Sequence, residues 1–388
     1  MSLSRQPAVR LRSPRRGSVI VLVLVLVLLT AMLLNRFIES TSVGLLLETR
    51  YADREHLRQD ARAALEVTLA TLADFIAVDH GLYTPAQGWS DPLAYAGYTP
   101  RPGVTIAISF EDESGKIPLP NASRDTLFAL FEHLGLADAE ANKVTDALFF
   151  WIQDGYVPTN AEVDDSVYAA AVTPYQPAHR SLRSFDELRS VLVARDFFFD
   201  ADDQPKPLFK EFSDSVSLYS FSTSNVNAAL SSTLAASLLD DSQAKTIADY
   251  VSGTGSRLAG APPYLRSGKD YRDVMGSAPN NGLGTTIKCL RIKIVVTEGA
   301  ANLTLTALVA QPGQAALPPV ATVGDTTSAQ NQVGTANTTS TDTAAAGQSQ
   351  ATGSTTRTQS SSPLNYPFVI LELNEESSML PPPSNASL

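Results

Sequence analysis

The sequence predicts an α+β protein in which a long N-terminal helix packs on an antiparallel sheet, with a large all-helical domain inserted between the strands. Three observations lead to this prediction. An apolar segment near the N-terminus continues without a break into an amphipathic helical pattern. Alternating strand patterns stand both before and after a middle region of helical periodicity. With 388 residues, 44% of them hydrophobic, the chain is long enough for two packed domains.

The first element is an apolar helix behind a basic leader. Residues 1–16 contain five arginines and no acidic residue, and residues 19–29 are apolar without one charge. As a helix, residues 18–34 span roughly 25 Å, near the lower limit for crossing a bilayer. Because positive residues stay on the cytoplasmic side, everything beyond Asn35 should be exported. We therefore predict a single membrane-spanning helix.

Three interpretations of this segment are open. A secretory signal would be cut after the apolar run at a small-x-small site, but the sequence that follows the run has no A-x-A. A plain signal anchor also fits the pattern. The third interpretation is a type IV prepilin-like signal, cut between Gly17 and Ser18. A basic leader, a glycine and then a long apolar run are typical of pilin and pseudopilin N-termini.

The fifth residue after that cut is Leu22, where most pilin-like subunits have a glutamate. A carboxylate at membrane depth costs on the order of 2.5–3.5 kcal/mol unless something pairs with it. In pilin-like fibres the partner is the α-amino group of the neighbouring subunit, so a subunit with no neighbour above it has nothing to pair. Leu22 therefore favours a tip subunit over a shaft subunit, although a simple signal anchor would lack the glutamate too.

The net charge limits the kinds of partner that the chain can bind, and the cysteine content limits its disulfides. The net charge of −11 becomes −16 when the five arginines of the leader are removed, which argues against nucleic acid or anionic lipid as a partner. The same acidity leaves room for a divalent cation. The single cysteine, Cys289, excludes an internal disulfide, and its strand-like surroundings favour a packed thiol.

The N-terminal part of the chain predicts one long helix, a loop and a first strand. Apolar residues spaced by three and four continue the first helix, so that residues 18–79 form one helix, apolar all round at first and amphipathic later. Gly44 is a place where this helix could kink. Residues 81–102 are rich in glycine and proline and predict a loop. Residues 104–110 alternate as a half-buried strand does.

The middle of the chain has helical periodicity, and strand patterns return after it. The predicted helices cover residues 121–134, 138–153, 184–193, 228–239, 242–251 and 269–275. A capping box of Ser184 and Glu187 opens the third of them, and a strand-like stretch interrupts the series at residues 215–221. Two alternating segments within residues 286–310 predict a hairpin.

The C-terminal part combines a low-complexity segment with one more strand. Residues 311–362 are rich in Thr, Ser, Ala, Gln and Gly and cannot bury enough apolar surface to order themselves. Residues 366–373 predict an edge strand, because Pro367 cannot donate a hydrogen bond within a central ladder. A polar, proline-rich tail follows.

Several stretches of the middle region resemble the K subunit of type II secretion, the largest minor pseudopilin. The matching stretches, in order, are ESGKIPLPN (113–121), FWIQD (150–154), AEVDDSVY (161–168), PYQPAHRSLRSFDELRSV (174–191) and SNVNAALSSTLAASL (224–238). Any one of them is weak, but their order behind a prepilin-like N-terminus is fairly specific. This sequence departs from the family at Phe150 and Gln153, where the family usually has aspartates, and at His179, where it has an asparagine.

The resemblance implies a pilin-like fold with a large helical insertion. Residues 1–17 would be the prepilin leader and residues 18–79 the membrane-spanning assembly helix. The pilin-like α/β domain would comprise residues 80–120 and 280–388, with residues 311–362 as a flexible low-complexity insert. The inserted helical domain would be residues 121–279.

The resemblance also implies a maturation route and partners. Prepilin peptidase would cut after Gly17, and Ser18 would be methylated. The protein would start as a single-pass inner-membrane protein with its C-terminal domain in the periplasm. It would then assemble with the I and J minor pseudopilins and the major pseudopilin, at the tip of the pseudopilus.

Some members of this family bind calcium in the helical domain, and calcium needs six to eight oxygen ligands. The candidate ligands here are Asp154, Glu162, Asp164 and Asp165. The alternative is an acidic, solvated loop. A second acidic cluster, residues 200–203, starts like a calcium loop, but Gln204 and Pro205 stand where an oxygen ligand and a glycine are needed. We predict a capped turn there.

No catalytic pattern is found in the sequence. The four histidines lack zinc-site spacing and no G-x-S-x-G motif is present. We therefore predict a non-enzymatic subunit: a minor pseudopilin that starts or caps fibre assembly for protein export across the outer membrane. The alternatives are a signal-anchored periplasmic binding domain, a minor pilin of a type IV pilus, and an anchored exported enzyme.

Overall fold

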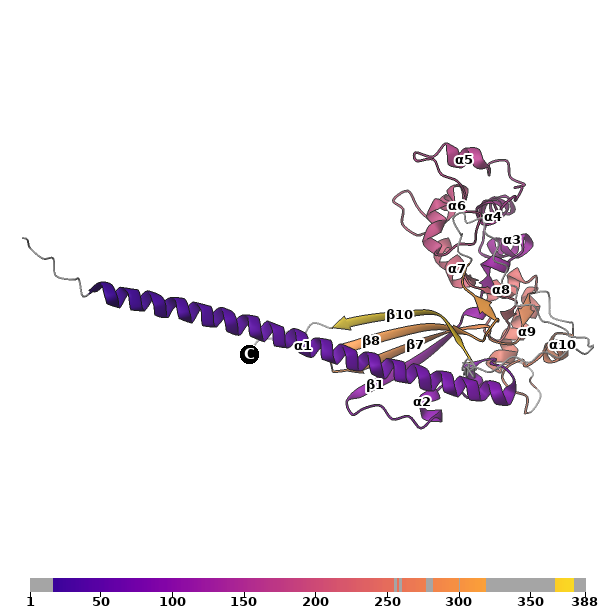
Figure 1. Ribbon diagram of the computed structural model, residues 1–388. Helices are drawn as coiled ribbons and strands as arrows, with labels where there is room; N and C mark the ends of the chain where they lie inside the picture. The colour runs from indigo at the N-terminus through magenta and orange to yellow at the C-terminus, as the bar shows by residue number, and fades with distance from the viewer. Residues whose placement is uncertain are drawn as a thin grey trace, which may run out of the picture.

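The computed structural model describes residues 17–254, 257, 260–276, 282–299, 301–318 and 367–379. Its first element is α1 (Gly17–Asp79), a single helix that remains helical at Gly44. The C-terminal part of α1 lies along a four-stranded sheet, and the N-terminal part projects beyond the sheet as a bare rod (Figure 1). The predicted α+β class and the predicted long helix are both confirmed.

The sheet is antiparallel, with strand order β1-β7-β8-β10. Its strands are β1 (Val104–Asp112), β7 (Cys289–Glu298), β8 (Ala301–Ala310) and β10 (Val369–Met379). The predicted β7–β8 hairpin is confirmed, and β10 is an edge strand as expected. However, β10 begins after the predicted start and runs on to Met379, because it pairs with β8 as far as Ala301.

The sheet packs on α1 through side chains spaced by three and four. Leu57, Ala61, Ala64, Leu65, Leu69 and Leu72 are all buried against the sheet core. The two alanines let the helix approach the strands closely. Ion pairs close the edges of this contact: Arg101 Nη2 lies 2.7 Å from Asp60 Oδ2, and Arg58 Nε lies 2.7 Å from Glu375 Oε2 on β10. The amphipathic half of α1 thus belongs to the globular part of the protein, which comprises the sheet and the helical region and which we call the head.

The helical region lies at the end of the sheet away from the rod (Figure 1). Its helices are α3 (Arg124–His133), α4 (Asp138–Ile152), α5 (Asp165–Ala169), α6 (Leu192–Phe198), α7 (Pro207–Ser215), α8 (Ser231–Ala236), α9 (Asp241–Ser252) and α10 (Gly268–Met275). Shorter helical turns are η1 (Pro85–Gln87), α2 (Pro92–Tyr95), η2 (Glu113–Gly115), η3 (Leu119–Asn121) and η4 (Phe185–Ser190). Phe131, Phe198 and Phe212 are in mutual contact in its core, with the rings of Phe131 and Phe212 stacked and that of Phe198 tilted against both.

The predicted capping box at Ser184 is wrong. The Ser184 hydroxyl accepts a hydrogen bond from the Asp186 amide at 3.1 Å, which is the tighter spacing of a 3-10 turn. The Glu187 carboxylate does not return to the Ser184 amide. It binds the Arg180 guanidinium at 2.9 Å instead, and an ion pair of this kind is stronger than a neutral cap.

The middle region is not purely helical, contrary to the prediction of an all-helical insert. It contains β3 (Val216–Ser217), β4 (Ser220–Phe221) and β5 (Ser224–Asn225). Of these, β3 and β4 confirm the strand-like stretch that was predicted at residues 215–221. Their partners lie outside it or at its borders, and are β2 (Ile117–Pro118), β9 (Ala315–Ala316) and β6 (Leu283–Gly284), respectively. These residues are extended because they pair with strands that are distant in sequence.

The low-complexity segment and the leader fall largely outside the described residues. β9 lies within residues 311–362, so the start of that segment is paired with β4. Residues 319–362 and the leader residues 1–16 are outside the described residues. Cys289, at the start of β7, is completely buried, which confirms the packed thiol and raises its pKa.

Candidate functional site: the exposed rod, the domain joint and the acidic loop

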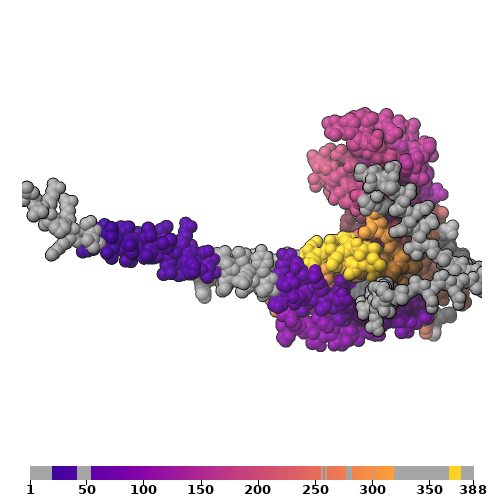
Figure 2. Space-filling model, in the orientation of Figure 1, coloured from indigo at the N-terminus to yellow at the C-terminus, as the bar shows by residue number. Residues whose placement is uncertain are grey.

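The N-terminal part of α1 is an apolar rod with no covering structure. Residues 20–41 have a mean hydropathy of 2.5, and none of this segment is buried. It is the one helix among the described residues that is long and apolar enough to cross a membrane. Figure 2 shows this rod extending well away from the head. Apolar surface on this scale requires lipid or other helices as its surroundings.

The two threonine hydroxyls of the rod are satisfied within the helix. Thr30 Oγ1 donates to the Val27 carbonyl at 2.9 Å, and Thr41 Oγ1 donates to the Phe37 carbonyl at 2.8 Å. Backbone pairing of this kind suits a helix in lipid or in a helical bundle. Leu22, at the fifth position after the predicted cut, is 67% exposed on the rod. Gly17 and Ser18 form the first turn of α1.

A pair of asparagines joins the sheet to the helical region. Asn225, which is completely buried, donates from Nδ2 to the Tyr83 carbonyl at 2.9 Å and to Asp112 Oδ2 at 2.7 Å. Its Oδ1 accepts from the Asn227 backbone and side-chain amides at 3.2 and 3.1 Å. Both donor hydrogens and the carbonyl oxygen of this amide are therefore used.

Asn227 continues the same network toward the segment before β7. Its Nδ2 donates to the carbonyls of Leu265 at 2.9 Å and Thr285 at 2.8 Å, and its Oδ1 accepts from the Leu265 amide at 2.7 Å. The two asparagines thus connect the loop after α1, the end of β1 and two later segments. We call Asn225 and Asn227, with the groups they bind, the asparagine joint.

Asp112 connects the asparagine joint to the turn that follows β1. Its Oδ1 accepts from the amide and the hydroxyl of Ser114 at 2.9 and 2.5 Å, and Ser114 Oγ accepts from the Lys288 amide at 2.9 Å. Burial raises the pKa of Asp112 to about 6, against the opposing effect of the hydrogen bonds from Ser114 and Asn225. A carboxylate is therefore held at the joint largely by neutral donors.

The four predicted calcium ligands do not converge. The Glu162 carboxylate pairs with the Lys143 ammonium. Asp164 caps α5 by accepting from the Ser166 and Val167 amides at 2.9 and 3.3 Å. Asp154 and Asp165 are exposed to solvent. Within the described part of the chain, no group of three or more His, Cys, Asp or Glu side chains is placed to share an ion.

The structure adds an acidic residue that the pattern analysis did not single out, Asp146. It is completely buried in α4, and its carboxylate accepts hydrogen bonds from Tyr156, Thr159 and Asn160 of the following loop. Burial alone would raise the pKa of Asp146, but hydrogen bonds from these residues and the charge of Arg124 lower it below its usual value. Its neighbours at four and three residues before it are Asn142 and Lys143, so helical periodicity placed Asp146 on the polar face and gave no signal of its burial.

The second acidic cluster is the capped turn that we predicted. Asp200 Oδ1 accepts from the amides of Asp202 and Gln204 at 2.9 and 2.8 Å. Asp203 pairs with Arg189, with the two charged atoms 2.6 Å apart. The carboxylates of Asp200 and Asp203 are therefore committed to backbone amides and to arginine, respectively.

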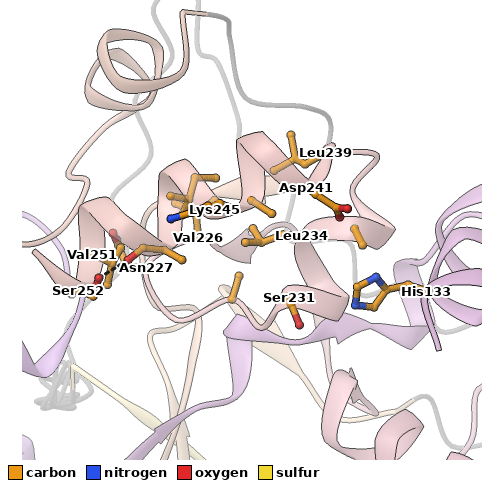
Figure 3. A pocket seen from close by; sticks show the side chains of 15 residues that line it. His133, Val226, Asn227, Ser231, Leu234, Leu239, Asp241, Lys245, Val251 and Ser252 are labelled. Carbon is orange, nitrogen blue, oxygen red and sulfur yellow. Dashed lines mark hydrogen bonds between the residues drawn. The ribbon is translucent and has the colours of Figure 1, made fainter. Parts of the chain in front are cut away.

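A cavity of about 420 Å³ lies between α8 and α9 (Figure 3). Its lining is mostly apolar, and His133, Ser231 and Asp241 are its notable polar side chains. A nucleophile, base and orienting acid would have to be hydrogen-bonded to one another. No hydrogen bond joins these three side chains in the described structure.

The comparisons with known proteins found matches to a family model and to a solved structure. Residues 109–196 match the family model described as "Type II secretion system (T2SS), protein K". No curated protein matches the chain. Among solved structures, the chain is similar to one in the crystal structure of the GspK-GspI-GspJ complex from the enterotoxigenic Escherichia coli type 2 secretion system. That match has a TM-score of 0.42 and 15% identity, and covers 68% of this chain and 95% of that chain.

Proposed function

We propose, from the premise that residues 109–196 are a type II secretion system protein K domain, that this chain is a minor pseudopilin at the tip of a pseudopilus. The observation that carries the proposal is the division of α1. Its C-terminal half is built into the head, whereas residues 20–41 are bare and apolar. A protein with this plan can exchange a membrane for a bundle of similar helices without refolding its head.

The energetics of the rod favour such an exchange. Covering one large apolar side chain is worth about 1.5–3 kcal/mol, so the rod is unstable in water but stable in lipid. Lipid tails and neighbouring helices are similarly apolar, so the transfer between them depends on packing rather than on the hydrophobic effect. In our proposal the rod leaves the inner membrane by packing against the rods of the I and J minor pseudopilins and the major pseudopilin.

Two features support a place at the tip. Leu22 provides no carboxylate for the amino group of a neighbouring subunit above. The helical region widens the head at the end opposite the rod (Figure 1). A subunit stacked above would have to place its own rod beside this widened head. We propose that the helical region thereby blocks upward extension and that the subunit starts or caps the fibre.

Maturation is the first test. We expect the mature protein, purified from membranes of cells that contain prepilin peptidase, to begin at N-methylated Ser18. Gly17→Leu should retain the leader, because a large residue would replace the small one before the cut. Intact-mass spectrometry and N-terminal sequencing measure both. The matched control is Gly44→Leu, which changes another glycine of α1 and should be processed normally. An intact Met1 in the wild-type protein would instead support a plain signal anchor.

Position in the fibre is the second test. We expect a gold label on an affinity tag at the C-terminus to appear only at fibre ends in electron micrographs, because a head that cannot be stacked upon occurs once per fibre. The control is the same tag on the major pseudopilin, which should label the whole length. Labels of this protein spaced along the shaft would overturn the tip assignment, even if the leader is removed as expected.

A further inference from the structure

The loop between α4 and α5 is the place where the resemblance implies calcium, and its residues do not fit that role. We propose that the guanidinium of Arg124 supplies the positive charge that holds this loop, so that the helical region is fastened here without a divalent cation. The inference concerns the internal chemistry of the domain and does not depend on the proposed function.

Both carboxylate oxygens of Asp146 are already occupied by hydrogen bonds. Oδ2 accepts from the Thr159 amide at 2.8 Å, the Thr159 hydroxyl at 2.6 Å and the Asn160 amide at 2.8 Å. Oδ1 accepts from the Tyr156 hydroxyl at 2.7 Å and from Arg124 Nε at 3.2 Å. A carboxylate offers roughly four acceptor sites, so these five donors leave none for a metal ion.

Arg124 contacts both α4 and the first half of the loop. Its Nη2 donates to Asn142 Oδ1 at 2.7 Å and to Thr159 Oγ1 at 3.3 Å, and lies 3.2 Å from Asp146 Oδ1. Arg124 Nε also donates to the Tyr156 hydroxyl at 3.2 Å. A single fixed cation at the start of α3 therefore binds α4 and the loop together.

The remaining carboxylates of the loop each have a separate partner or face solvent. Glu162 is paired with Lys143, and Asp164 caps α5. Calcium requires several oxygens around one point, whereas each of these carboxylates is committed separately. Asp154 and Asp165 are left, and two exposed carboxylates do not form such a site.

The test compares the full-length protein in detergent micelles with and without calcium. We expect the melting temperature in millimolar CaCl₂ to match that in excess EGTA, and isothermal calorimetry to show no saturable calcium binding. A micromolar site would raise the melting temperature by several degrees under these conditions. A saturable, calcium-dependent rise in the wild-type protein would overturn the proposal.

Variants test the role of Arg124 itself. We expect Arg124→Gln to lower the melting temperature and to speed chymotrypsin cleavage after Tyr156 by about tenfold, because loop opening becomes more frequent. Arg183→Gln is the matched control. It removes one positive charge at an exposed arginine of the same region, and chymotrypsin should cleave this variant at the wild-type rate. Should Arg124→Gln not fold, Arg124→Lys keeps the charge and should show intermediate cleavage. Wild-type cleavage rates in the Arg124 variants would overturn the assignment.

Discussion

Asn225→Ala should lower the free energy of unfolding by about 3 kcal/mol or more, because it leaves several buried polar groups unpaired. The Tyr83 carbonyl and the Asp112 carboxylate would each lose a donor, and the Asn227 amides would lose their acceptor. Each buried group left without a partner costs about 1–3 kcal/mol. Thermal and urea unfolding of the full-length protein in detergent measure the loss.

The matched control is Asn374→Ala on β10. That asparagine is exposed, and among the described residues its side chain bonds to the nearby Glu372 side chain, so its loss should change stability by less than about 0.5 kcal/mol. If Asn225→Ala has the same melting temperature as the control variant, then the asparagine joint does not hold the helical region on the sheet. Its place in the protein would then have to be explained by something other than stability.

Gly115→Ala should be the second strongly destabilising change, for a steric reason. A Cβ built on Gly115 would lie 2.6 Å from the Ala228 carbonyl oxygen and 2.9 Å from its carbonyl carbon. Both are backbone atoms next to the asparagine joint, so neither can move aside as a flexible side chain can. Overpacking costs about 1–3 kcal/mol, and a backbone contact of this kind belongs at the upper end.

Gly81→Ala provides the comparison for Gly115→Ala. A Cβ at Gly81 would meet its nearest atoms at 3.4 Å, an ordinary contact distance, and it should be close to neutral. Urea unfolding of both variants, side by side, gives the difference directly. Equal midpoints would show that the turn after β1 and the segment before α8 can separate at little cost, which would contradict a rigid attachment of the helical region.

The joint and the rod together explain how the head is organised for assembly. Arg58 and Arg101 tie α1 to the sheet, and the asparagine joint ties the sheet to the helical region. In our proposal, a displacement of the rod against neighbouring subunits is passed to the head through these contacts. This rigidity is what a subunit needs if its wide end is to block stacking.

The local and periodic parts of the structure were determined by the sequence alone. The long helix, the half-buried first strand and the β7–β8 hairpin each repeat an apolar pattern over many residues, and that pattern reflects which face is buried. The apolar rod and the absence of a carboxylate at Leu22 are likewise readable without a structure. The K-type motifs pointed to the segment that the family model later matched.

The tertiary structure alone decided the contacts between distant segments. Strands of two residues, such as β5 and β6, have no period to detect, and each partner lies far along the chain. The roles of Asn225 and Asp146 depend on which backbone groups arrive beside them, which spacing in the sequence does not encode. Ser184 was mispredicted for the same reason, because Arg180 takes its expected partner. Periodicity reports burial, whereas the pairing of buried polar groups is set only when the chain has folded.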